Sequence, residues 1–373
     1  MNVQLKSGVQ ESQDHVYDAL KAQKATLLLE DGTSFEGACF GYVGACAGEV
    51  VFSTGMVGYP EAFTDASYSG QILVMTYPLI GNYGVPLSSY WESQRIHLAG
   101  LVVSNYVDTP SHAQSEMTLA TWLKRQQVPA LEIKDTRALT QHLRTYGTML
   151  GKIVFDEEIP FRDPNKENLV AKASVRQVMH FGHGEKRVIL IDCGAKQNIV
   201  RCLLKRGVQV TVVPWNYDLF SSGLDFDAIV ISNGPGDPKM ATATINTVKQ
   251  ALAYKVPTLG ICLGNQILAL AAGGDTYKLK FGHRSQNQPC VMRDSKRCYI
   301  TTQNHGFAVG TVPPDFVPWF TNANDGSNEG IMHVTQPFMS VQFHPEANPG
   351  PQDTEWVFDY FLQRIAGTME QVA

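Results

Sequence analysis

The 373-residue sequence has no apolar run long enough to span a membrane. Its first two dozen residues contain acidic side chains but no arginine and no apolar core, which excludes the usual signal and transit peptides. We therefore expect a cytoplasmic protein. The formal net charge of -5 comes without any basic cluster, so we expect neither nucleic acid nor a membrane surface as a partner.

Two further classes of site are missing from the sequence. The 7 cysteines are odd in number and scattered without a C-x-x-C pair, and the 10 histidines are equally dispersed. This pattern excludes a disulfide framework and a zinc site, and we expect no metal. The G-K-[ST] sequence of a phosphate loop is absent as well, which agrees with a chain that binds no nucleotide cofactor of its own.

What is present suffices for two domains, because 44% of the residues are hydrophobic in a chain longer than a usual single domain. We predict a polar leader over residues 1–24 and a small α+β domain over 25–155, where short strand-like runs are punctuated by glycine. A charged segment with Pro, Gly and Asn, residues 156–186, is predicted as the linker. The second domain is predicted over residues 187–370.

The second half alternates buried strands with helices. RVILIDCG, VQVTVVP, DAIVISNGPGDP and VPTLGIC have the composition of buried strands, and segments with helical periodicity intervene. This order predicts an α/β fold with a doubly wound, mostly parallel sheet. Ligands bind such sheets at the carboxyl ends of the strands, and both the SNGPGDP turn and Cys262 follow strand ends.

Cys262 lies in LGICLGNQ, residues 259–266, between a strand and a helix. The small residues Gly260 and Gly264 permit a sharp turn, as in a nucleophile elbow. The positive end of the helix would favour the reactive thiolate, and the N–H of Leu263 would be free to stabilise an oxyanion. The alternative is a buried, inert thiol, which is common for free cysteines.

A candidate base lies in FMSVQFHPEANPGP, at what we predict to be the end of a strand. His344 and Glu346 are two residues apart, so an extended chain would project both side chains to the same side, and the carboxylate could orient the imidazole. Taken alone, such a pair is as well explained by a surface position. Cysteine, histidine and glutamate together have the roles of a catalytic triad.

Two turns complete the set of candidate features. In SNGPGDP, Gly234 and Gly236 would let backbone N–H groups approach a substrate, although an isolated G-P-G is also an ordinary tight turn. In TTQNHGFAV, residues 301–309, we expect a polar turn that contains Asn304, His305 and Gly306. That turn proves nothing by itself.

These elements, in this order, resemble a class I (triad) glutamine amidotransferase, with GICLG as the cysteine elbow and HPE as the distal part of the triad. The stretch from GEVVFSTG to LIGNYGV at 48–85, together with SNGPGDP, QNHGFAV and HPEANPGP, is similar to the small, glutaminase component of carbamoyl phosphate synthetase. The resemblance covers about residues 25–365. VPWN, NQPC and TNANDGSNEGIMH look most like the fused synthetases of eukaryotes.

The resemblance implies that Cys262 attacks the side-chain amide of L-glutamine and that backbone N–H groups of Leu263 and Gly236 hold the oxyanion. His344 would protonate the leaving ammonia and then activate water, and Glu346 would orient His344. The glutamine contacts that it implies are Ser67, Gly234, Gly236, Leu263, Gln266, Asn304, Gly306 and Phe307.

The resemblance also implies a protein partner. The ammonia would pass to a large synthetase component, either a separate chain or one fused after residue 373, and that component would hold ATP and magnesium. No cofactor is then expected in this chain. Because Ser67 belongs to the first predicted domain, the glutamine site would lie between the domains, where binding clefts are common.

The sequence departs from the family pattern at three places. Members with an active glutaminase usually have His at the position of Asn265, glycine-rich sequence at 284–289 (RSQNQP), and a polar residue at Gly55. Asn265 is expected within a turn of the thiol, where a neutral amide cannot supply the charge of an imidazolium. We hypothesise that glutaminase activity survives in reduced form.

Two other functions are compatible with these features. A non-catalytic regulatory or interaction domain would keep the fold while its partner used free ammonia, and the departure at Asn265 leaves room for it. A different cysteine hydrolase, such as a peptidase, would not need the first domain or Ser67. The intact Cys262, His344 and Glu346 favour glutamine hydrolysis.

Overall fold

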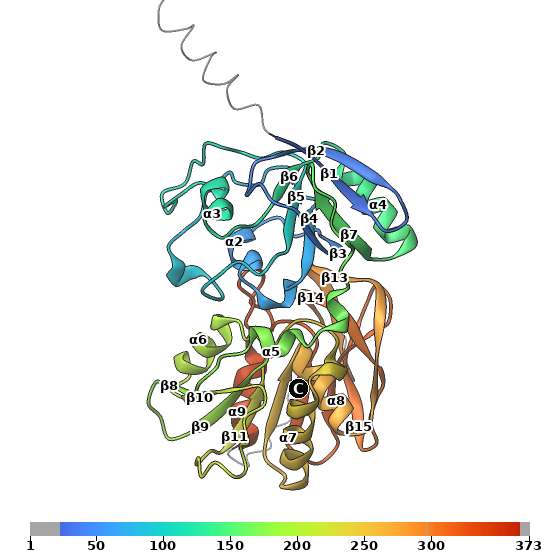
Figure 1. Cartoon of the computed structure of the whole chain (residues 1–373). Helices are drawn as coiled ribbons and strands as arrows, with labels where there is room; N and C mark the ends of the chain where they lie inside the picture. Colours follow the sequence, from blue (N-terminus) through green and yellow to red (C-terminus); the bar gives the residue numbers. More distant parts are fainter. Residues whose placement is uncertain (1–22, 296, 366–373) are drawn as a thin grey trace, which may run out of the picture.

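A computed structural model describes residues 23–295 and 297–365. Residues 1–22 of the predicted leader and 366–370 of the predicted second domain lie outside the described residues. The described chain forms two sheets, one closed into a barrel and one open, and β13 and β14 of the open sheet lie next to the barrel (Figure 1). In the described ranges, no helix combines the length and the apolar character that crossing a membrane requires.

The barrel is a mixed sheet of seven strands in the order β1-β2-β6-β5-β4-β3-β7, closed by antiparallel pairing of β1 with β7. Its elements are β1 (Lys24–Leu29), β2 (Ser34–Cys39), β3 (Cys46–Ser53), α2 (Tyr59–Phe63), β4 (Gln71–Met75), β5 (Gly100–Val103), α3 (Leu119–Arg125), β6 (Ala130–Glu132), α4 (Thr136–Tyr146) and β7 (Met149–Val154). A short 3₁₀ helix, Ala66–Tyr68, precedes β4.

Alternate residues of the barrel strands enter two apolar clusters. On β4, Ile72 packs in the cluster that contains Leu139 of α4, whereas Leu73 packs in the cluster that contains Trp122 of α3. This is the period of two expected of a strand that is buried on both faces. Helix α4 begins where the side chain of Asp135 accepts a hydrogen bond from Ala138 N at 2.8 Å.

The second sheet has ten strands in the order β14-β13-β15-β16-β17-β12-β11-β9-β10-β8. The chain enters it through α5 (Leu169–Ala173) and continues through β8 (Met179–Phe181), β9 (Arg187–Asp192), α6 (Gln197–Lys205), β10 (Gln209–Pro214), β11 (Ala228–Ile231), α7 (Thr242–Ala253), β12 (Thr258–Ile261), α8 (Leu263–Ala271), β13 (Asp275–Met292), β14 (Cys298–Thr311), β15 (Phe316–Asn322), β16 (Asn328–His333), β17 (Phe338–Val341) and α9 (Trp356–Ile365). Its centre, β10-β9-β11-β12-β17, is parallel throughout.

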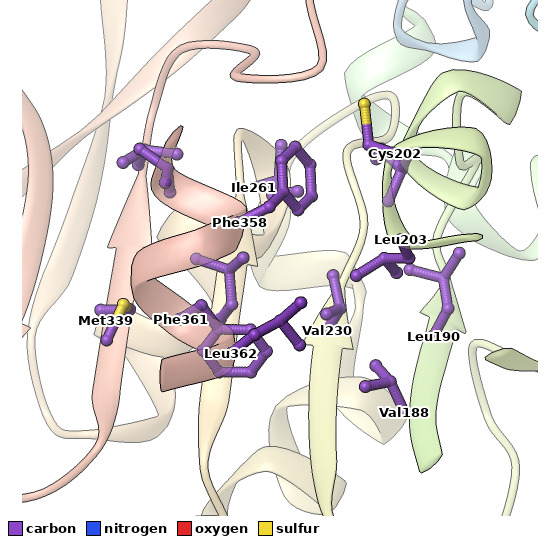
Figure 2. Packing of buried hydrophobic residues seen from close by; sticks show 14 of the residues in the cluster. Val188, Leu190, Cys202, Leu203, Val230, Ile261, Met339, Phe358, Phe361 and Leu362 are labelled. Carbon is purple, nitrogen blue, oxygen red and sulfur yellow. The ribbon is translucent and has the colours of Figure 1, made fainter. Parts of the chain in front are cut away.

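Helices cover both faces of this parallel centre, so the predicted α/β fold class is confirmed. On one face, Phe358 and Phe361 of α9 belong to one apolar cluster with Val188 and Leu190 of β9, and Phe358 lies beside Ile261 of β12 (Figure 2). On the other face, Ile189 lies in the cluster that contains residues of α7 and α8. The sequence RVILID is therefore apolar at every interior position because both of its faces are buried.

The open sheet extends further than we predicted. β13 to β16 add an antiparallel part on one side, and β8, inside the segment predicted as linker, pairs antiparallel with β10 on the other. Our prediction of a turn at 301–309 is wrong, since these residues belong to β14. Their polar side chains suggested a loop, but they belong to a strand that is buried against the barrel and carries irregular pairing with β13.

Candidate active site

The candidate site residues gather where the parallel strands of the second sheet end. Cys262 directly follows β12, Gly234 and Gly236 follow β11, and His344 comes three residues after β17. These strands are neighbours and run in the same direction, so the residues after them meet at one edge of the sheet.

Cys262 has the strained backbone of a nucleophile elbow. Its φ of 54° and ψ of -102° are unusual for a residue with a side chain, and it is the N-cap of α8. A Cβ at Gly260 would lie 2.4 Å from the carbonyl oxygen of Gly264, and one at Gly264 would lie 2.2 Å from that of Ile231. The predicted strand-to-helix turn is therefore confirmed, and it needs both glycines.

The thiol of Cys262 is 98% buried, and its Sγ lies 3.7 Å from the carbonyl oxygen of Asn304, to which it donates. His344 is held by a hydrogen bond from its backbone N to Thr302 O at 2.9 Å. The side chain of Cys262 and the backbone of His344 are thus both held by β14, the strand that lies next to the barrel.

His344 and Glu346 interact as predicted, with 2.6 Å between Nδ1 and Oε1. Burial opposes the charged imidazole, but the Glu346 carboxylate and the Cys262 sulfur outweigh it and raise the pKa of His344 above its ordinary value. Nε2 of His344 has no hydrogen-bond partner among residues 23–295 and 297–365. Glu346 therefore holds the ring of His344 through Nδ1, and Nε2 is available to exchange a proton with the Cys262 thiol or with a reacting group.

A buried lysine extends this array beyond the three predicted residues. Nζ of Lys196 lies 3.2 Å from Oε1 of Glu346, and both side chains are almost fully buried. Burial raises the pKa of Glu346, but Lys196 and His344 together lower it below its ordinary value. Glu346 is therefore ionised at neutral pH, and its carboxylate holds the imidazole of His344 in place through the contact with Nδ1.

A narrow pocket opens beside Cys262. All eight predicted glutamine contacts line it: Ser67, Gly234, Gly236, Leu263, Gln266, Asn304, Gly306 and Phe307. No backbone or side-chain acceptor in the described part of the chain binds the N–H of Leu263 or of Gly236. The structure thus brings the predicted contacts together and leaves both proposed oxyanion donors free.

Ser67 reaches the pocket from the barrel half. Asp65 caps the short helix that carries it, because its Oδ1 accepts from Ser67 N at 2.9 Å. The same carboxylate accepts from Asn233 Nδ2 at 3.1 Å and from Asn304 Nδ2 at 2.9 Å. Asp65 therefore joins three walls of the pocket across the two halves of the chain.

The side chain of Asn265 forms its hydrogen bonds with Ser340 and Gln342, not with the thiol of Cys262. The Asn265 side chain is fully buried, donates to Gln342 Oε1 at 3.0 Å, and accepts from Ser340 Oγ at 2.8 Å. Gln342 Oε1 also accepts from Gln266 Nε2 at 3.1 Å. The influence of Asn265 on the site therefore runs through Gln342 to Gln266, a pocket residue.

A second polar cluster lies beside the pocket. His283, His305 and Glu329 offer ligand atoms that lie within 4.8 Å of one another, a spacing that could hold a metal ion. His283 Nδ1 and His305 Nε2 both lie close to Gln303 Oε1, at 3.0 Å and 3.1 Å. Asn322 Nδ2 donates to Glu329 Oε1 at 3.0 Å. The cluster is thus already connected by hydrogen bonds.

Sequence reasoning missed Asp65, Lys196 and Arg284, and it also missed Glu49, Gln71 and Asn165 of the pocket lining. Asp65 in TDASYSG has the sequence of a capping aspartate, and Lys196 follows the end of the strand RVILID, so both had a local signal. Arg284 had none, because nothing in RSQNQP shows that its side chain lines the pocket.

The two halves of the chain match two different families of known proteins. Residues 27–153 match the family "Carbamoyl-phosphate synthase small chain, CPSase domain", and residues 189–364 match "Glutamine amidotransferase class-I". The "Carbamoyl phosphate synthase arginine-specific small chain" of Saccharomyces cerevisiae is 47% identical over 92% of this chain and 89% of that protein. The chain belongs to the carbamoyl-phosphate synthase small-chain family. Its second half is a class I glutamine amidotransferase domain.

This small-chain sequence is also similar to parts of much longer proteins. It is 51% identical to the "Multifunctional protein CAD" of Squalus acanthias over 91% of this chain and 16% of that protein. It is 46% identical to "Carbamoyl-phosphate synthase [ammonia], mitochondrial" of Mus musculus over 93% of this chain and 24% of that protein. The chain thus spans a quarter or less of these two relatives.

Proposed function

We propose that the chain hydrolyses L-glutamine to glutamate and ammonia, as the glutaminase component of a carbamoyl phosphate synthetase. The observation that carries the proposal is one pocket in which Cys262, at an elbow, is surrounded by all the residues that the family assigns to glutamine. Family membership supports the proposal, because both halves of the chain match this family.

The first step forms a thioester. Cys262 gives its thiol proton to Nε2 of His344, and the resulting thiolate attacks the side-chain amide carbon of glutamine. The oxyanion that develops accepts hydrogen bonds from the N–H groups of Leu263 and Gly236. His344, held as an imidazolium by Glu346, gives the proton on Nε2 to the leaving nitrogen, so the C–N bond breaks and neutral ammonia departs.

The second step releases glutamate. His344 is now neutral at Nε2 and takes a proton from a water molecule, which attacks the thioester carbon. The C–S bond breaks, glutamate leaves, and the thiolate and imidazolium are restored. The depth of the site limits premature protonation of ammonia by bulk water.

We propose further that the ammonia passes to a synthetase component that binds ATP and magnesium and makes carbamoyl phosphate from bicarbonate. Similarity to a small chain from yeast and to segments of much longer proteins supports both a separate and a fused partner. No cofactor is proposed for this chain, since the class I chemistry uses the cysteine as nucleophile.

A second candidate function is a silent glutaminase-like domain that regulates an ammonia-using synthetase. The 46% identity to the ammonia-dependent mouse protein favours it. The intact array of Cys262, His344 and Glu346 favours hydrolysis instead. The positive φ of Cys262 costs conformational free energy, and a silent domain would gain nothing from that strain.

Incubation of the purified chain with L-glutamine, with and without a synthetase partner, distinguishes the two functions. We expect glutamate release that Cys262→Ser reduces by at least about a thousandfold without loss of the folded state. Cys298→Ser, at an exposed cysteine, is the matched control and should retain full activity. No glutamate release under either condition would support the silent domain.

A further inference from the structure

Arg284 is a pocket residue for which the reaction described above has no use. It lies on β13, paired with Asn304 of β14, and it lines the pocket together with Cys262. It also falls within the segment, 284–289, where the sequence departs from the glycine-rich pattern of the family. Its side chain is therefore a buried cation in the pocket lining that has no assigned role.

The backbone leaves room for the guanidinium beside a predicted glutamine contact. A Cβ on Gly306 would lie 3.2 Å from Nη2 of Arg284, and one on Gly282 would lie 2.5 Å from Nη1. Because Gly282 and Gly306 have no side chain, the guanidinium of Arg284 can lie against the backbone of β13 and β14. Nη2 is consequently placed next to Gly306 in the pocket wall.

Arg284 forms no salt bridge with a carboxylate in the described chain, although Glu49 lies near enough to interact with its charge. The residue is 4% exposed, its Nε has no hydrogen-bond partner, and its one hydrogen bond runs from Nη1 to Phe281 O at 2.7 Å. Among residues 23–295 and 297–365 it forms no ion pair. Burying a cation costs free energy unless an anion lies next to it and compensates for the lost hydration.

The one carboxylate in the pocket lining is already neutralised. Glu49 lies 2.5 Å from Lys278 Nζ and also accepts weakly from Thr148 and Asn165. Arginine remains protonated even when buried, and its planar N–H groups match a carboxylate. The pocket thus contains, together with the nucleophilic Cys262, a guanidinium that forms no salt bridge.

We propose that Arg284 binds the α-carboxylate of the substrate and so restricts the site to free glutamine. This inference rests on the proposed function. Glutamine carries one permanent anion, its α-carboxylate, while the side-chain amide that reacts is neutral. A glutaminyl residue within a peptide lacks that anion, so Arg284 rejects it by leaving its own charge unpaired.

The test compares L-glutamine with L-glutamine α-amide, which keeps the reactive side chain and lacks the carboxylate. Turnover is followed as ammonia release, and binding is measured by calorimetry in a Cys262→Ala background. We expect Arg284→Met to raise the KM and the dissociation constant for glutamine about 10- to 100-fold, with both constants for the amide nearly unchanged. Arg284→Lys, which keeps the charge, should recover part of the loss.

Arg293→Met is the matched control, because Arg293 is a half-exposed arginine just after the same strand. A thermal melt of each variant verifies the fold. If Arg284→Met weakens both substrates by the same factor, or leaves glutamine unaffected, the proposal is overturned. Absence of glutamine hydrolysis by the unsubstituted chain would instead overturn the proposed function, and the calorimetric comparison would still report on Arg284.

Discussion

At the scale of single residues, buried hydrogen bonds between side chains support the wall of the pocket. Asn265 shows this most clearly, because both atoms of its carboxamide are used by Ser340 and Gln342. The residue that separates this sequence from the family pattern therefore acts as a buried support of the pocket wall. Its effect should be on stability and on glutamine binding.

We expect Asn265→Ala to lower the free energy of unfolding by about 1–3 kcal/mol, because Ser340 and Gln342 lose a buried partner. The KM for glutamine should rise through Gln266, while kcat should stay within about twofold. Urea unfolding and steady-state kinetics measure the two effects, with the exposed Asn324→Ala as control. A large fall in kcat with an unchanged KM would revive direct tuning of the thiol.

His97 gives a residue-scale prediction for acid pH. Burial, with Arg95 as a second cause, lowers the pKa of His97 to about 4, and its ring nitrogens contact Ser69 and Ser93. In the unfolded chain His97 would bind a proton near pH 6.5, whereas in the folded chain it stays neutral at that pH. Stability attributable to His97 should therefore fall by about 2–3 kcal/mol as the pH drops from 6.5 to 4.

His97→Gln removes this titration, so the difference in unfolding free energy between the two proteins should depend on pH in that window. Urea unfolding at several pH values between 7 and 4 measures it. Parallel curves would contradict the prediction, because they would show that the pKa of His97 is the same in the folded and the unfolded chain.

At the scale of elements, β12 and α8 are fitted to each other through two glycines. The clash predicted for a Cβ at Gly264 is with backbone, which cannot rotate away, and α8 is buried over most of its length. The elbow at Cys262 thus depends on a close approach of β11 to the first turn of α8.

We expect Gly264→Ala to destabilise the chain by about 2–3 kcal/mol and to reduce glutaminase activity, because the helix must move away from β11. Gly273→Ala is a graded control: its φ of 97° is strained for alanine, but no atom lies within 4 Å of the added Cβ. It should cost about 1 kcal/mol and leave activity intact. Equal effects of both substitutions would refute the packing explanation.

At the scale of the whole molecule, the site exists because the two halves of the chain share buried polar contacts. Asp65 of the barrel half binds Asn233 and Asn304, and Glu92 binds Arg201 at 3.1 Å and the backbone N of Asn198 at 2.9 Å. Glu92 is fully buried, so its contacts also determine the stability of the junction.

A double-mutant cycle of Glu92→Ala and Arg201→Ala tests this junction. Glu92→Ala should cost about 2–4 kcal/mol, and the coupling between the two residues should be about 1–3 kcal/mol. Thermal unfolding of the four proteins provides the numbers, and the exposed Asp294→Ala should change stability by less than about 0.5 kcal/mol. Additive single effects would mean that the pair does not join the halves.

The sequence by itself determined the α/β fold class, the elbow at Cys262 and the contact of His344 with Glu346. These features depend on local periods, on glycines that permit a turn, and on two residues in one extended segment. Such signals lie within a few residues of each other, so they can be recognised before the chain folds.

Only the tertiary structure decided what surrounds these residues. Residues 301–309 are polar and resemble a loop, but pairing with β13 and burial against the barrel make them a strand. Arg284 and Lys196 enter the site through contacts with residues far away in the sequence, and Asn265 bonds to Ser340 and Gln342, which only the folded chain brings within reach. Which polar groups are buried, and which hydrogen-bond partners they find, depends on how the whole chain packs. No local sequence pattern encodes this.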